Sequence, residues 1–304
     1  VLPYASAVCL AEVAEQSLFN NNKDWSQTER MVKEMWMKDM FGVDKPIIAL
    51  LHLRALPGDP LYQRGGSIEQ VTETARKELL ALQKGGVDGV LIANEFSLPY
   101  EKKVSPVAVA AMGYIVGALR EDIKIPFGVN IVLNPLATID LAAAVGASFV
   151  RSTFTGAYIG EDGLTDTDIS VVTRRKNALG LDNLKLLYKV NPESGVYLAE
   201  RPIEKITKSM IFHCFPDALC VSGASAGTET DNSLIQRVRE VAGDTPVLCN
   251  TGCTAENICE KLDYCDGACV GTAFKKDGKF QNLVETDRVK LFMDRVRQYR
   301  NKHR

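Results

Sequence analysis

The chain has 304 residues, 46% of them apolar and 24% charged, which are ordinary values for a globular protein with a large core. These values exclude disorder, collagen and coiled coil as descriptions of the whole chain. Lysine and arginine number 36 against 38 aspartate and glutamate, a formal net charge of −2, so a broad nucleic-acid-binding surface is not expected.

Residues 1–45 lie outside any repeated pattern and predict an N-terminal extension that is helical or partly disordered. The string Asn20-Asn21-Asn22 divides this extension into two helical segments. The second segment, Thr28–Phe41, either caps the bottom of the following domain or frays into solvent, and the sequence leaves both possibilities open.

From residue 46 to the C-terminus, short apolar runs alternate with amphipathic helical segments. Most of the apolar runs lack a strict polar alternation, as expected for parallel strands that are covered on both faces. Eight such strands are predicted: Pro46–Leu51, Gly89–Ala93, Phe127–Val132, Ser148–Ser152, Lys185–Val190, Ala218–Ser222, Val247–Cys249 and Gly267–Val270.

A helical pattern follows each predicted strand. Ser67 and Gln70 form a capping-box signal, and Ser105-Pro106 is typical of an N-cap followed by a first-turn proline. The predicted helices are Ser67–Lys84, Pro106–Arg120, Pro135–Val145, Asp166–Leu179, Pro202–Phe212, Asp231–Val241, Thr254–Leu262 and Glu285–Arg300.

Eight strands that are each followed by a helix predict a single (β/α)₈ TIM barrel over residues 46–304. An open doubly wound sheet is the alternative, but it would want a Gly-x-Gly-x-x-Gly turn after the first strand, and none occurs there.

Neither a membrane span nor a secretory signal is predicted. The longest uncharged apolar run, Val107 to Leu119, has about 13 residues where a span needs about 20. The N-terminus lacks a basic region, and Glu12 and Glu15 interrupt its apolar stretch. We therefore expect a cytoplasmic protein.

The chain has eight cysteines, and those from Cys249 to Cys269 contain no Cys-x-x-Cys pair. Zinc binding is therefore not predicted, and reduced thiols are the simpler interpretation. Cys253 differs because it lies in a loop after a strand, but its sequence neighbours include no histidine that would make it a nucleophile.

In a TIM barrel the chemistry lies on the loops that follow the strands. His52 ends the first strand and Glu95 follows the second, so these two side chains are the candidate acid/base pair. A packed core histidine and an exposed loop acid are the respective alternatives. Lys189, at the end of the fifth strand, either forms a Schiff base, binds an anion or points to solvent.

Further polar side chains follow the middle strands and are candidates for orienting a substrate. They are Asn94, Asn130, Arg151 and Asn191. A buried arginine needs an anion, which for Arg151 is either a ligand or a structural partner such as Glu95.

Small residues follow the last three strands, where barrels usually bind phosphate through backbone N–H groups. The candidate phosphate-binding residues are Gly223, Thr251, Gly252, Gly271, Thr272 and Lys275. The alternatives are that the glycines only make tight turns and that Lys275 belongs to a solvated turn.

Several strings resemble the BtpA/SgcQ family, and the SgcQ-like branch is the closer match. They are HLRALPGDP at 52–60, GGVDGVLIANEFSLPY at 85–100, IPFGVNIVLNP at 125–135, FTGAY at 154–158, DALCVSGASAGTETD at 217–231 and NTGCTAEN at 250–257. The resemblance runs from about residue 37 to residue 300 and implies a (β/α)₈ barrel.

The resemblance implies less about function. BtpA-like members are associated with photosystem I accumulation in cyanobacteria, and SgcQ-like members resemble proteins encoded among sugar-uptake and pentose-phosphate-type enzymes. Some members carry a nucleotide-hydrolase label. Where the BtpA-like pattern reads Glu-Asn and then Gly-Asp, this chain reads Asn94-Glu95 and then Ser97-Leu98. The difference removes an acid and argues against a shared substrate.

Together, the residues and the resemblance favour an enzyme of carbohydrate metabolism, of isomerase, epimerase or lyase type, that acts on a phosphorylated sugar or similar small phosphometabolite. A non-catalytic assembly factor of the BtpA type and a nucleotide phosphatase are the two alternatives. No cofactor is predicted, a divalent metal is left open, and a homo-oligomer is compatible with the sequence.

Overall fold

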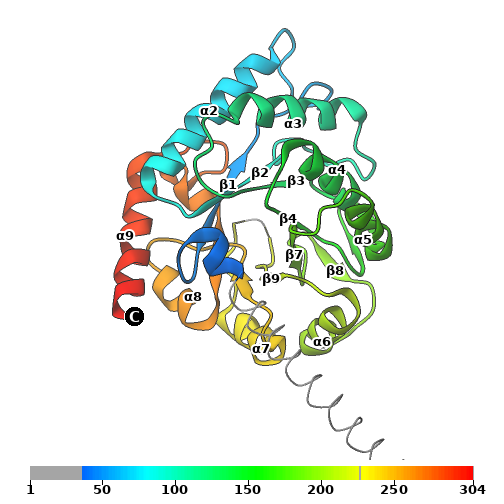
Figure 1. Cartoon of the computed structure of the whole chain (residues 1–304), viewed down its shortest axis with the longest axis vertical. Helices are drawn as coiled ribbons and strands as arrows, with labels where there is room; N and C mark the ends of the chain where they lie inside the picture. The colour runs from blue at the N-terminus through cyan, green and yellow to red at the C-terminus, as the bar shows by residue number, and fades with distance from the viewer. Residues whose placement is uncertain (1–35, 226, 304) are drawn as a thin grey trace, which may run out of the picture. The chain divides into compact units, whose positions relative to one another are not determined.

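Eight parallel strands form a closed barrel in the computed structural model, which describes residues 36–225 and 227–303 (Figure 1). The strands are β1 (Ile47–His52), β2 (Gly89–Ala93), β3 (Phe127–Asn130), β4 (Phe149–Ser152), β7 (Lys185–Lys189), β9 (Ala218–Val221), β10 (Val247–Cys249) and β11 (Gly267–Val270). Their order around the barrel is β1-β11-β10-β9-β7-β4-β3-β2, which confirms the predicted TIM barrel.

Helices surround the barrel and follow its strands in chain order (Figure 1). They are α2 (Ile68–Gly85), α3 (Pro106–Leu119), α4 (Pro135–Val145), α5 (Ile169–Ala178), α6 (Ile203–Cys214), α7 (Asn232–Ala242), α8 (Ile258–Tyr264) and α9 (Thr286–Lys302), with the 3-10 turns η1 (Thr272–Phe274) and η2 (Lys276–Gly278) before α9. The Ser67–Gln70 capping box and the Ser105 N-cap are both present. No helix within the described ranges is long and apolar enough to cross a membrane.

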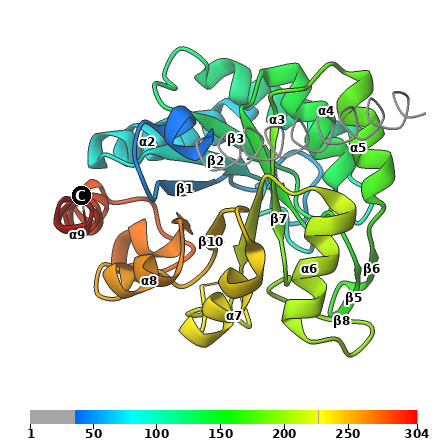
Figure 2. The same cartoon turned by 60° about the horizontal axis from the view of Figure 1, so that its bottom comes forward.

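A small antiparallel sheet, β6-β5-β8, was not predicted. It consists of β5 (Ala157–Gly160), β6 (Gly163–Asp166) and β8 (Gly195–Tyr197), which lie side by side in Figure 2. The predicted helix start at Asp166 is therefore wrong, since that residue pairs with Ala157 and α5 begins only after its N-cap, Asp168. Strands this short do not give a clear period in the sequence.

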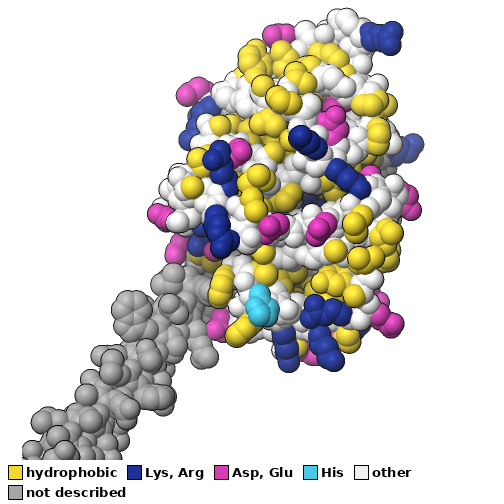
Figure 3. Space-filling view, turned by 90° about the vertical axis from the view of Figure 1, so that its right-hand side faces the viewer, with side chains coloured by type: hydrophobic (Ala, Val, Ile, Leu, Met, Phe, Trp, Pro, Cys, Tyr) yellow, Lys and Arg dark blue, Asp and Glu magenta, His cyan; other side chains and the backbone are white. Residues whose placement is uncertain are grey.

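The two faces of this sheet differ. Tyr158 is 3% exposed, packs on Tyr197 with ring centroids 5.1 Å apart and lines the pocket described below. The strands also carry exposed apolar side chains, namely Ile159, Leu164, Val196 and, just beyond β8, Leu198. Figure 3 views the side of the barrel that carries α4 to α6, where hydrophobic side chains lie between charged ones.

The same aspartate-to-backbone hydrogen bond recurs at the amino ends of three strands. Asp88, Asp217 and Asp266 each lie directly before a strand, and each carboxylate accepts a backbone N–H from the neighbouring strand. The donors are Ile47, Leu186 and Val247, at distances of 2.8 to 2.9 Å. Register at the bottom of the barrel is therefore set by side chains as well as by the backbone ladder.

The last residues of the predicted extension lie at this bottom end. Residues 36–41 are helical, and the Phe41 ring lies 5.7 Å from the Phe149 ring at the start of β4. A Cβ at Gly89 would come within 2.6 Å of Phe41, so the glycine makes room for that ring. The remainder of segment 28–41 lies outside the described residues, and its capping role stays a prediction.

Candidate functional site

A pocket of about 390 Å³ opens at the carboxyl ends of the barrel strands. Side chains from β1, β3, β4 and β7 line it together with the loops after β2, β10 and β11 and the β5-β6 hairpin. The structure thus brings together most of the residues singled out from the sequence: His52, Glu95, Asn130, Arg151, Lys189, Thr251, Gly252, Gly271 and Thr272.

Arg151 is the centre of the charged network in this pocket. Its side chain is 2% exposed, and its Nη1 donates to Oδ1 of Asn250 at 2.7 Å. Its Nη2 lies 3.6 Å from Oε1 of Glu95. The structural ion pair considered from the sequence is therefore present, but Arg151 also lines the cavity, so the two interpretations are compatible.

A second carboxylate, Glu193, completes the network and was not among the predicted site residues. Its Oε2 lies 2.7 Å from Nζ of Lys189, and its Oε1 accepts from Nδ2 of Asn250 at 2.8 Å. Burial alone would raise the pKa of Glu193, but Lys189 and Arg151 outweigh burial and hold the pKa below its ordinary value. Asn250, which was also missed, joins this pair to Arg151.

Tyr100 holds the other carboxylate in place. Its hydroxyl donates to Oε2 of Glu95 at 3.0 Å, and it lines the pocket beside that residue. Burial, followed by the negative charge of Glu95, raises the pKa of Tyr100 far above its ordinary value. The phenol therefore stays protonated and remains a hydrogen-bond donor to the carboxylate.

Three buried polar atoms, on residues that line the pocket, have no hydrogen-bond partner among the described residues. They are Nδ1 of His52, Oδ1 of Asn130 and Nε of Arg151. Because buried polar groups in folded proteins are nearly always hydrogen-bonded, unpaired atoms in a cavity wall indicate where a ligand or water binds. They offer an amide acceptor, a guanidinium donor and an imidazole nitrogen.

Two predicted substrate-binding residues lie behind the pocket wall instead. Oδ1 of Asn94 accepts the backbone N–H of Val132 at 2.8 Å. Asn191 exchanges two hydrogen bonds with the backbone of Ser222, at 2.8 and 3.0 Å. Both asparagines join one strand end to the next, and their predicted role in binding substrate stays a prediction.

Two predicted phosphate-binding residues are also engaged elsewhere. The N–H of Gly223 donates to Oγ1 of Thr251 at 2.6 Å. Lys275 is fully buried with its Nζ 3.6 Å from Oε1 of Glu78, which is 2% exposed. Burial lowers the pKa of Lys275 although Glu78 opposes that shift. Neither residue lines the pocket, since the Gly223 N–H contacts Thr251 and the Lys275 ammonium contacts Glu78 instead.

Gly252 lines the pocket and is also required by local packing. It adopts φ +69°, and an added Cβ would lie 2.2 Å from Cα of Glu229. The loops after β9 and β10 therefore pack against each other backbone to backbone at this point. The tight-turn interpretation of this glycine holds whether or not an anion binds beside it.

We expect Gly252→Ala to destabilise the protein by about 2–4 kcal/mol, since both left-handed strain and overpacking apply. Gly180→Ala is the matched control, because Gly180 has φ +65° but no atom within 4 Å of the added Cβ. Urea unfolding should show only the strain cost, of about 1 kcal/mol, in that control. Equal losses in the two variants would contradict the close approach at Gly252.

His52 is 5% exposed and lies beneath Gly271, where a Cβ would come within 2.8 Å of the imidazole. Its ring centroid is 5.2 Å from that of Phe280. Burial, followed by the charges of Lys275, Arg151 and Arg54, lowers the pKa of His52 well below 6.5. The imidazole is therefore neutral near pH 7 and can accept or donate one hydrogen bond, but it carries no charge.

This lowered pKa makes stability depend on pH. Below pH 6.5 the unfolded chain binds a proton at His52 that the folded protein does not, so the free energy of unfolding falls as the pH falls. We expect the difference between the wild type and His52→Gln to shrink by up to about 1.4 kcal/mol per pH unit below that point. Urea unfolding between roughly pH 7.5 and pH 5.5 measures it, and parallel pH profiles would contradict the shift.

Seven cysteines in the described part of the chain are free thiols, and Cys253 lines the pocket. Its contact with Cys249, followed by burial, raises the pKa of Cys253 well above its ordinary value, which does not favour a nucleophilic role in the resting state.

No group of three or more His, Cys, Asp or Glu side chains among the residues with described positions is placed to hold a metal ion.

Comparison with known proteins agrees with the barrel fold. The BtpA family model matches residues 43–298. A protein named for the sgc region, SgcQ of Escherichia coli (strain K12), is 48% identical over 265 residues, which cover 87% of this chain and 99% of that protein. The photosystem I biogenesis protein BtpA of Synechocystis is 28% identical and covers 84% of this chain and 88% of that protein.

Among solved structures, (S)-3-O-geranylgeranylglyceryl phosphate synthase from Thermoplasma acidophilum superposes with a TM-score of 0.54. It covers 86% of this chain and 97% of that chain at 13% identity, so the likeness concerns the fold alone. The family model spans nearly the whole barrel, and SgcQ matches 87% of this chain at 48% identity. The chain therefore belongs to the BtpA family.

Proposed function

We propose that this protein is an enzyme that moves a proton on a phosphorylated sugar or a similar small phosphometabolite, as an isomerase, epimerase or lyase. The observation that carries the proposal is the set of unpaired buried atoms in the pocket wall, on His52, Asn130 and Arg151. Neighbouring hydroxyl and carbonyl groups of a sugar offer both donors and acceptors at short spacing, which suits such a set.

The charges around these atoms support acid–base chemistry. Glu95 lies at the cavity surface and is the candidate base. The Arg151 guanidinium and the Lys189 ammonium are placed to stabilise negative charge that develops on a substrate oxygen when a carbon-bound proton is removed. Glu193 keeps those two cations in place through Lys189 and Asn250.

A phosphate group would bind at the β11 side of the pocket. The N–H groups of Thr272 and Ala273 begin the η1 turn, where the first donors of a helical turn have no partner within it. Arg288 lines the same part of the cavity. Its Nε donates a hydrogen bond to the carbonyl oxygen of Ala273 at 3.0 Å, which is the one hydrogen bond of this side chain among the described residues. Arg288 thus replaces Lys275 as the candidate phosphate-binding cation.

The test is proton exchange. The protein is incubated in D₂O with a panel of sugar phosphates, and proton NMR follows the loss of carbon-bound protons, which all three reaction types produce. Asn130→Leu is the informative variant, because Oδ1 of Asn130 has no hydrogen-bond partner among the described residues. We expect it to fold normally and to raise KM about tenfold, the worth of one lost hydrogen bond.

Glu204→Gln, at an exposed ion pair with Arg237 on α6, is the control and should leave exchange unchanged. If no sugar phosphate exchanges a proton or raises the melting temperature, the enzyme proposal fails. The assembly-factor alternative, favoured by the likeness to a photosystem I biogenesis protein, predicts that outcome. Release of phosphate from nucleotides, without exchange on sugar phosphates, would instead support the phosphatase.

A further inference from the structure

Two thiols face each other across the short loop that follows β10. Sγ of Cys253 lies 3.3 Å from Sγ of Cys249, and the loop between them consists of Asn250, Thr251 and Gly252. A disulfide needs an S–S separation of about 2.0 Å, so the sulfur atoms have to approach by roughly 1.3 Å. This approach is within the reach of side-chain rotation and a small movement of the loop.

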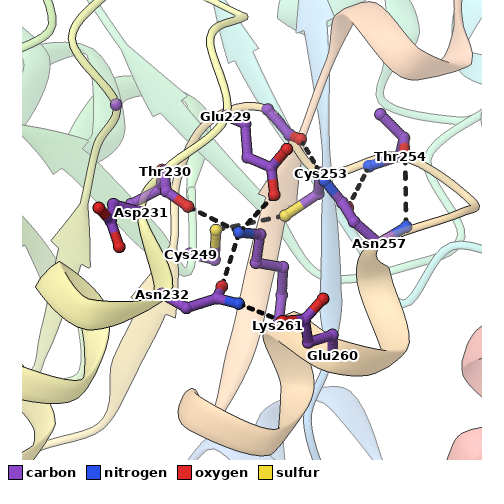
Figure 4. A network of polar contacts seen from close by, with 12 residues as sticks. Glu229, Thr230, Asp231, Asn232, Cys249, Cys253, Thr254, Asn257, Glu260 and Lys261 are labelled. Carbon is purple, nitrogen blue, oxygen red and sulfur yellow. Dashed lines mark hydrogen bonds and ion pairs between the residues drawn. The ribbon is translucent and has the colours of Figure 1, made fainter.

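A buried cation lies beside this pair. The Lys261 side chain is 1% exposed, and its Nζ contacts the carbonyl oxygen of Thr230 and a carboxylate oxygen of Glu229, each at 2.7 Å. Figure 4 draws Lys261 in one polar network with Cys249 and Cys253, and its charge acts to lower the pKa of both thiols. Positive charge close to a thiol favours the thiolate, which is the reactive form in disulfide chemistry.

The two thiols are not equivalent. The Cys253 thiol donates to Cys249, and this contact lowers the pKa of Cys249 and raises that of Cys253. Burial opposes the lowering at Cys249, while Thr230 and then Lys261 add to it. Cys253 lines the pocket and contacts Cys249, so a small oxidant that enters the cavity reaches the thiol pair from the Cys253 side.

We propose that Cys249 and Cys253 form a reversible disulfide, which makes the β10 loop an oxidation-sensitive modification site for small hydroperoxides. The thiolate of Cys249, which the contact with Cys253 favours, attacks one oxygen of hydrogen peroxide and becomes a sulfenic acid, and the outgoing hydroxide takes the proton of the Cys253 thiol and leaves as water. The Cys253 thiolate then attacks the Cys249 sulfur, the S–O bond breaks, and the departing hydroxide takes up the proton that Cys249 released and gives a second water. Two thiols are oxidised and one peroxide is reduced.

The full-length protein is treated with hydrogen peroxide, the remaining thiols are alkylated, and intact mass and peptide mapping are recorded. We expect a mass lower by about 2 Da before alkylation, a Cys249–Cys253 linked peptide, and recovery of both thiols with dithiothreitol. Cys253→Ser should abolish the linked peptide. Cys259→Ser is the control, since Cys259 is half-buried and lies away from the pocket, and the link should form in it as in the wild type.

If both residues remain free thiols, or are separately driven to sulfinic acids, the proposal is overturned. It is also overturned if the disulfide joins only other cysteines, or if the link forms equally fast in urea-unfolded protein. The last outcome would mean that proximity in sequence, and not the folded loop, brings the thiols together.

One consequence rests on the proposed function. Asn250 lies inside the loop that the disulfide would tighten, and it binds both Arg151 and Glu193. Proton exchange on the sugar phosphate should therefore fall at least about tenfold in the oxidised protein and return on reduction. Absence of exchange in every redox form contradicts the enzyme proposal alone, whereas absence of the linked peptide contradicts only the disulfide.

Discussion

Replacing Arg151 by methionine is expected to destabilise the protein by about 3–5 kcal/mol, the usual cost of removing one partner from a buried ion pair. Arg151 is 2% exposed and provides the positive charge nearest to Glu95. Methionine fills much of the volume but leaves that carboxylate without its counter-ion and Oδ1 of Asn250 without its donor. Urea unfolding, followed by circular dichroism, measures the loss.

Two further variants separate charge from packing at this position. Arg151→Lys keeps the charge but loses the geometry of the guanidinium, so we expect an intermediate loss. Arg237→Met removes an arginine from an exposed pair with Glu204 and should change stability little, because exposed ion pairs contribute little. A wild-type midpoint in Arg151→Met would show that the network is dispensable for the fold.

The barrel was predictable because each level of the sequence indicates the same structure. Apolar runs, capping residues and terminal glycines all recur in the order strand then helix, and the structure reproduces all eight pairs to within a few residues. The β6-β5-β8 sheet was not predictable in this way. Its strands come from two different loops, so the pairing of Ile159 with Val196 depends on the barrel that brings those loops together.

The site was only partly predictable for a similar reason. Position at a strand end correctly placed Glu95, Asn130 and Arg151 in the pocket wall. It could not reveal that Lys275 pairs with Glu78, which is far away in the sequence and belongs to α2. Whether a strand-end side chain lines the cavity or supports it depends on partners that only the folded loops provide.

Glu193 was missed, although the sequence contains a pattern that could have predicted its ion pair with Lys189. It lies four residues after Lys189 in the loop that follows β7, and a spacing of four does not bring side chains together outside a helix. In the structure the chain bends at Val190 and Asn191 and turns at Glu193, and Lys189 and Glu193 meet at 2.7 Å. A charged residue at the end of a strand and an opposite charge in the turn that follows form a usable pattern for other barrels.

Replacing Glu95 by glutamine is expected to lower the rate of proton exchange by about 10²–10⁴-fold, the usual contribution of a positioned general base. Glutamine keeps the volume and can still accept the hydrogen bond from Tyr100, but it cannot take up a proton. NMR exchange rates in D₂O, with the sugar phosphate that the wild type turns over, provide the measurement.

The variant also tests how the two carboxylates divide their roles. Glu193 accepts from Asn250 and pairs with Lys189, so Glu193→Gln should act mainly through the position of those groups and cause a smaller loss of exchange. Tyr100→Phe removes the hydroxyl that donates to Glu95 and should lower the exchange rate by less than Glu95→Gln does, because the carboxylate is kept but is held less firmly in place. If Glu193→Gln abolishes exchange while Glu95→Gln retains it, the base is Glu193 and substrate approaches from the β7 side of the pocket.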